Sequence, residues 1–139
     1  MNYVVYAFVA LVAYSVVPPF VDIATEEIPS STAALISNSI LVAVALGVVA
    51  YNGDWDVSYL TGRHALYAYA AGVALAVGIL AYYRALELGP VSVVVPIFGM
   101  FIVGSAVVGV VFLDESVTAR KVVGVALAVV AVYLVTVEP

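Results

Sequence analysis

The stretch LGPVSVVVPIFGMFIVGSAVVGVVFL, residues Leu88–Leu113, decides the fold because it runs without a single charged side chain. A helix rises about 1.5 Å per residue, and about 20 apolar residues cross the hydrocarbon layer of a bilayer. This stretch is therefore long enough to span a membrane as a helix. Four more charge-free stretches flank it: Met1–Val21, Ile28–Gly53, Ala65–Tyr83 and Val122–Val137. The pattern predicts an all-α integral membrane protein with five transmembrane helices.

The composition agrees with a membrane location and argues against several kinds of chemistry. Apolar residues make up 66% of the chain and charged residues 9%, whereas soluble domains average about 25% charged residues. The chain has no cysteine and one histidine, so we expect no metal site and no cofactor. It has only four basic residues, which argues against nucleic-acid binding. No Ser/His/Asp set or intramembrane carboxylate pair is available, so we expect no enzymatic activity.

The breaks between the apolar stretches set the expected boundaries of one membrane domain, residues 1–139. The expected helices cover residues 3–24, 31–51, 65–86, 91–113 and 118–136. Paired Pro18-Pro19 is expected to kink the first helix, because each proline removes an amide donor. Ser30 is a candidate N-cap of the second helix, although Pro29 can also end the loop. Gly89-Pro90 is expected to break the chain before the fourth helix, with Pro96 one turn inside it.

The basic residues favour one orientation only slightly. With five crossings the two termini are expected on opposite sides of the membrane, with Arg63, Arg120 and Lys121 on the N-terminal side and Arg84 near the other. Basic loops stay on the cytoplasmic side, so we expect a multi-pass protein of the cell membrane with a cytoplasmic N-terminus. The bias is small enough to permit insertion in both orientations.

Two motifs carry a resemblance to a known family. Residues Tyr82–Pro96 read YYRALELGPVSVVVP, and Leu113–Thr118 reads LDESVT before a last helix that contains glycine. This pairing resembles the EamA domain of the drug/metabolite transporter superfamily, with its AL-x-x-G-P/S-x-S turn and LGE-x-x-T-like turn. Asp114 stands where the family usually has Gly. Tyr14-Ser15 replaces the family's aromatic-Gly pair, and the Arg common early in the second helix is absent.

The resemblance implies that the chain is one five-helix half of a ten-helix carrier built from inverted repeats. Such carriers bind substrate near the midplane, between the repeats, so one unit supplies one wall of the cavity. We therefore expect a secondary transporter of a small metabolite or amphipathic solute, working by alternating access as an antiparallel homodimer. The alternative is a non-transporting membrane interaction protein, or the accessory half of a heteromeric transporter.

Polar and small side chains inside the helices are the candidates for the substrate cavity. The amide of Asn38 would lose hydrogen bonds in lipid, so it is interpreted equally as an interhelical hydrogen bond or as cavity lining. No charge lies at the bilayer centre, which favours neutral or zwitterionic substrates. The candidate cavity residues are Tyr14, Ser15, Asn38, Tyr67, Gly78, Tyr82, Tyr83, Pro96 and Gly99.

Two charges and one pair of small residues complete the candidate sites. Asp22 and Arg84 are candidate vestibule charges near helix ends. The alternatives are a solvated loop end for Asp22 and an interfacial anchor for Arg84, paired with Glu87 by i,i+3 spacing. Gly124 and Ala128 form a small-xxx-small pair and are our candidate dimer seam. The expected partners are the lipid bilayer, a small-molecule substrate and a second copy of the chain.

Overall fold

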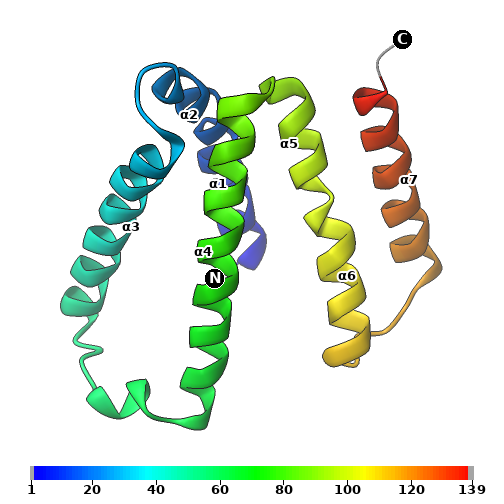
Figure 1. The fold of residues 1–139 in the computed structure, drawn as a ribbon. Helices are drawn as coiled ribbons and strands as arrows, with labels where there is room; N and C mark the ends of the chain where they lie inside the picture. Colours follow the sequence, from blue (N-terminus) through cyan, green and yellow to red (C-terminus); the bar gives the residue numbers. More distant parts are fainter. Residues whose placement is uncertain (1, 138–139) are drawn as a thin grey trace. The chain divides into compact units, whose positions relative to one another are not determined.

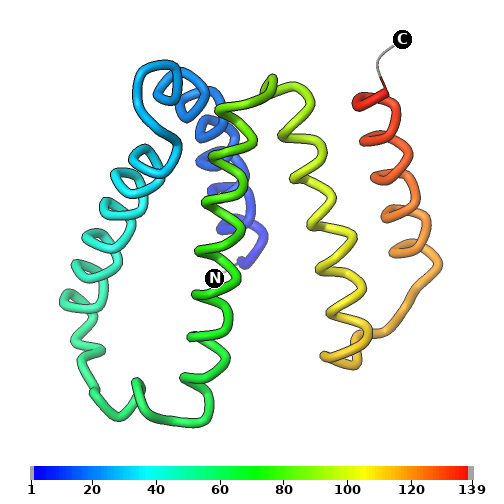
Figure 2. The backbone as a smooth tube through the Cα atoms, viewed as in Figure 1, coloured from blue at the N-terminus to red at the C-terminus, as the bar shows by residue number. Residues whose placement is uncertain are grey.

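The computed structural model describes residues 2–137, and this part of the chain is helical and contains no strand (Figures 1 and 2). The elements are α1 (Tyr3–Ser15), α2 (Val17–Thr25), α3 (Ser30–Asn52), the 3-10 helix η1 (Val57–Leu60), α4 (Arg63–Leu88), α5 (Val91–Gly99), α6 (Phe101–Phe112) and α7 (Ala119–Thr136). They give five spans long and apolar enough to cross a membrane, since α1 with α2 and α5 with α6 each make one span. The predicted all-α class with five transmembrane helices is confirmed.

The first span is divided into two helices at a point just before its prolines. We expected one helix over residues 3–24, kinked at Pro18-Pro19, but α1 ends at Ser15 and α2 begins at Val17. Prolines fit the first turn of a helix, where no amide donor is needed, and clash inside one. The chain therefore starts a new helix with Pro18 in its first turn. The hydroxyl of Ser15 donates to the Leu11 carbonyl at 2.7 Å.

The second span begins differently from the expectation. Pro29 occupies the N-cap of α3, and Ser30 is the first helical residue, so the prediction that Ser30 is the N-cap is wrong. The extended backbone of Pro29 places its carbonyl 2.9 Å from the amide of Thr32 and 3.0 Å from that of Ala33. The helix ends at Asn52 and is capped by Gly53, whose φ of 74° is a left-handed conformation that glycine adopts without strain.

The chain forms two compact units, one ending at Leu88 and one beginning at Gly89. In the first unit, α2, α3 and α4 contact one another in pairs. Figure 1 shows α3 and α4 diverging toward η1. Most of the buried apolar side chains lie at the opposite end of this helix pair: Val21, Ala33, Ala34, Tyr82, Tyr83 and Leu86. The remaining apolar side chains of α3 and α4 are largely exposed on the surface of this unit.

The second unit consists of α5, α6 and α7, with α7 in contact with both other helices. We expected one helix over residues 91–113, but it is interrupted at Met100, whose amide bonds the Ile97 carbonyl at 3.1 Å in a tight turn. After α6 the chain turns at Asp114, which has a φ of 52°. Asp114 is thus left-handed at the position where the EamA motif usually has glycine.

Candidate functional site

An open groove of about 460 Å³ lies between α3 and α4 in the first unit. Small residues make the room for it, because Ala34 of α3 and Gly72 and Ala76 of α4 all line the same space. Asn38 and Ser31 are the polar residues in its lining, and no charged residue within 2–137 lines it. The groove is therefore an apolar surface with polar groups only on the α3 side.

Asn38 presents a hydrogen-bond acceptor in this groove. Its Nδ2 donates to the Ala34 carbonyl one turn earlier, at 2.8 Å. A carbonyl only accepts hydrogen bonds, so the amide orientation is fixed by this contact. Among residues 2–137, no side chain or amide donates to Asn38 Oδ1, and no hydrogen bond joins Asn38 to another helix. Asn38 is half-buried, and its Oδ1 is free to accept a hydrogen bond from a donor in the groove.

One turn of α3 beside this groove is tied to α4 by a hydrogen bond. The hydroxyls of Ser37 and Tyr83 lie 2.7 Å apart. Ser37 Oγ also lies 3.0 Å from the Ala33 carbonyl, to which it donates, so the Tyr83 hydroxyl acts as the donor between the helices. Tyr83 is only 3% exposed, and burial of a hydroxyl requires such a partner. Tyr83 therefore positions the wall that carries Asn38.

Charged groups cluster where the end of α4 meets the start of α3. Arg84 Nη1 lies 2.7 Å from Glu87 Oε2, so the pair expected from their spacing forms. The Glu87 carboxylate also lies within reach of the hydroxyl and backbone amide of Ser30, the buried first residue of α3. A carboxylate is stabilised at the positive end of a helix dipole. Glu87 therefore stabilises the start of α3 from another helix.

The other candidates of the first unit lie outside the lining of the groove. Tyr14 and Tyr67 are each 68% exposed, and Ser15 and Gly78 are also exposed. Tyr82 is buried next to Tyr83, and Asp22 is half-buried on α2. Only Asn38 of the predicted cavity set lines the groove.

The remaining candidates belong to the second unit. Pro96 lies inside α5 and Gly99 ends it, both half-buried. Gly124 lines a second open groove, of about 720 Å³, between α6 and α7, while Ala128 does not. Within residues 2–137 no group of three His, Cys, Asp or Glu side chains is placed to hold a metal.

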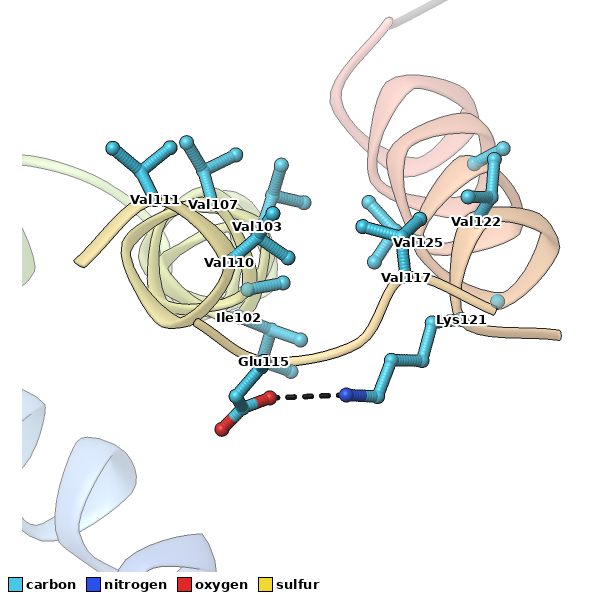
Figure 3. A pocket seen from close by; sticks show the side chains of 13 residues that line it. Ile102, Val103, Val107, Val110, Val111, Glu115, Val117, Lys121, Val122 and Val125 are labelled. Atoms are coloured by element: carbon cyan, nitrogen blue, oxygen red, sulfur yellow. Dashed lines mark hydrogen bonds and ion pairs between the residues drawn. The ribbon is translucent and has the colours of Figure 1, made fainter. Parts of the chain in front are cut away.

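An ion pair at one end of the α6–α7 groove was not singled out by the sequence. Lys121 Nζ donates to Glu115 Oε2 at 3.0 Å (Figure 3). The Glu115 side chain packs against Gly109, where an added Cβ would lie 3.2 Å from Glu115 Cδ. The sequence does contain the residues for this arrangement. Glu115 lies in the connection after α6, Lys121 lies in the first turn of α7, and Gly109 precedes Glu115 near the end of α6.

Comparison with known proteins places the sequence in a group of transporters. The family described as "EamA-like transporter family" matches residues 1–137. The uncharacterized transporter in the cobO 3' region of Sinorhizobium sp is 36% identical over 121 residues, which cover 86% of this chain and 82% of that protein. The two proteins are therefore of similar length. No solved structure gives a significant match.

Proposed function

This chain belongs to the EamA-like transporter family and is a multi-pass membrane transporter, and from that premise we propose that it carries small amphipathic solutes by alternating access. The proposed substrates are neutral or zwitterionic, with an apolar body and at least one hydrogen-bond donor. The observation that carries this proposal is the free Asn38 Oδ1 in an otherwise mostly apolar groove without charged lining. A desolvated acceptor favours solutes that donate to it over isosteres that do not.

We further propose that two copies pair in opposite orientations, with the N-terminus of one copy cytoplasmic in the cell membrane. The α3–α4 groove is open, so we expect a second copy of the chain to be needed to enclose a solute during transport. Five spans with only four basic residues support insertion in either orientation.

Transport by purified protein in liposomes tests the role of Asn38. A panel of radiolabelled amphipathic solutes first identifies one that the wild type accumulates, and Asn38→Ala is then compared with Ser39→Ala. Both residues bond the carbonyl four residues earlier, but Ser39 does not line the groove. We expect Asn38→Ala to lower uptake about tenfold, the effect of about 1.4 kcal/mol, and Ser39→Ala to leave it unchanged.

Three outcomes contradict these proposals. Equal uptake by Asn38→Ala and Ser39→Ala, with both variants folded, removes Asn38 from the substrate site. If the wild type moves no solute under any ion gradient, the chain is better interpreted as the accessory half of a heteromeric transporter. A C-terminal tag accessible from one side only, in intact cells and inverted vesicles, contradicts the antiparallel homodimer.

A further inference from the structure

The α6–α7 groove of the second unit covers about one leaflet of the bilayer. Its α6 lining runs from Ile102 to Val111, about 14 Å at 1.5 Å per residue. One leaflet contributes about 15 Å of the hydrocarbon layer. Ile102 lies near the middle of the span Val91–Phe112, whereas Val111 lies near its end. The groove therefore extends from the membrane interface to about the bilayer midplane.

The lining is apolar except at the interfacial end. Valines from both helices dominate it, as Figure 3 shows for Val103, Val110 and Val125. At the end formed by the α6–α7 connection, the lining includes Glu115 and Lys121, which form the ion pair. The groove thus combines an apolar channel with one negative and one positive group at the depth of lipid headgroups.

Each member of the ion pair can form a further hydrogen bond, Lys121 as a donor and Glu115 as an acceptor. Lys121 Nζ carries three N–H donors, and one of them binds Glu115 Oε2. Among residues 2–137, no donor binds Glu115 Oε1. A phosphate can therefore accept from Lys121 while an ammonium donates to Glu115, without breaking the pair.

We infer that the α6–α7 groove binds one acyl chain of a phospholipid whose headgroup carries both a phosphate and a primary ammonium, as in phosphatidylethanolamine. The length of the groove matches an acyl chain in one leaflet, whereas a helix of a second copy would cross both leaflets. The paired charges match a zwitterionic headgroup that donates hydrogen bonds. A choline headgroup has no N–H donor, and a glycerol headgroup has no positive charge.

Glycine substitutions in the two helices of the groove provide a matched test. An added Cβ at Gly124 meets no atom within 4 Å, and Gly124 lines the groove. An added Cβ at Gly104 on α6 also meets no atom within 4 Å, but Gly104 does not line the groove. Gly124→Leu therefore fills the site, and Gly104→Leu makes the same change outside it. Ala106→Leu fills the groove from α6 and serves if Gly124→Leu does not fold.

Native mass spectrometry of the full chain in detergent measures the binding of dioleoyl phosphatidylethanolamine, phosphatidylcholine and phosphatidylglycerol. We expect the wild type to bind the ethanolamine lipid about tenfold more tightly than the others, the usual effect of one hydrogen bond to a charged group. Gly124→Leu or Ala106→Leu should lose this binding, and Gly104→Leu should keep it. Glu115→Gln should weaken it toward the level of the choline lipid.

Three results overturn the inference. Equal affinity for the three lipids, or unchanged ethanolamine-lipid binding in the groove-filling variants, removes the lipid site. If Gly124→Leu converts a dimer into a monomer while lipid binding is unaffected, the groove holds a second copy instead of a lipid.

Discussion

The hydroxyl of Tyr83 in α4 lies 2.7 Å from the hydroxyl of Ser37 in α3, although 46 positions separate the two residues in sequence. This hydrogen bond joins the two helices one residue away from Asn38. Within this unit, most other buried side chains at that end of the helix pair are apolar. The directional hydrogen bond adds to the constraint from their packing, so the Ser37–Tyr83 pair helps to fix which residues of α3 face the groove.

Removing the Tyr83 hydroxyl should destabilise the protein. Tyr83→Phe leaves Ser37 with only its backbone carbonyl partners, and we expect unfolding to become easier by about 1 kcal/mol, a typical value for such bonds. Ser37→Ala should cost a similar amount, and the double variant should cost less than the sum. Unfolding in sodium dodecyl sulfate, followed by circular dichroism, measures this. Tyr51→Phe is the control, because Tyr51 is 92% exposed; additive effects in the cycle would contradict the coupling.

Replacing Asp114 by glycine should stabilise the α6–α7 turn. Asp114 has a φ of 52°, a conformation that strains most residues with a Cβ by about 1 kcal/mol. We expect Asp114→Gly to raise the free energy of unfolding by up to about that amount, and Asp114→Ala to lower it. Thermal unfolding of the three proteins in the same detergent provides the measurement. A lower melting temperature for Asp114→Gly than for Asp114→Ala would argue against a left-handed residue in this turn.

Alanine in place of two glycines of α6 should affect the melting temperature differently. At Gly109 a Cβ would lie 3.2 Å from Glu115 Cδ, so the Glu115 side chain has to move away from its pairing with Lys121. At Gly104 there is no atom within 4 Å, and alanine forms helices better than glycine by about 1 kcal/mol. We expect Gly104→Ala to raise the melting temperature and Gly109→Ala to lower it or leave it unchanged. A rise of equal size in both would show that Glu115 does not pack on Gly109.

The loop before α4 should respond to acid through Asp56. Its carboxylate accepts from the Ser58 amide at 2.8 Å and caps η1. Hydrogen bonds from Ser58 lower the pKa of Asp56 below its ordinary value of 3.8. The cap is therefore fully present above pH 3.8 and is lost as the pH falls through the lower pKa of the folded state. The emission of Trp55, the single tryptophan, should shift in that range.

A matched variant separates this effect from general acid unfolding. Asparagine also caps helices but does not titrate, so Asp56→Asn should abolish the acid shift of Trp55 emission and keep the loop folded. Asp54→Asn changes a neighbouring carboxylate that does not cap η1 and should keep the shift. The same acid response in all three proteins would exclude Asp56 as its origin.

The sequence predicts the helices well because their apolar length is a property of local sequence. Prolines also mark where helices are interrupted, but local rules do not say whether a proline kinks a helix, begins a new one or caps the next one. At Pro18-Pro19 the chain ends α1 early and begins α2, rather than bending one helix. At Pro29 the backbone conformation makes the proline the cap, which displaces Ser30 into the helix.

The site is less predictable because it depends on contacts between distant segments. Asn38, which lines the groove, could be singled out from the sequence, since an amide deep in an apolar helix needs a polar partner or water. The Ser37–Tyr83 bond was not, because helical periodicity assigns faces without saying which faces meet. The lining by Gly72 and Ala76 likewise follows from how α3 and α4 diverge, which no local pattern encodes.

The position of Glu87 beside the first turn of α3 bears on how the protein is made. Ser30 leaves the ribosome well before Glu87, with the rest of α3 and nearly all of α4 synthesised in between. During that time the first turn of α3 lacks the carboxylate that it meets in the finished protein. Part of what stabilises the first turn of α3 therefore becomes available only after α4 has been synthesised.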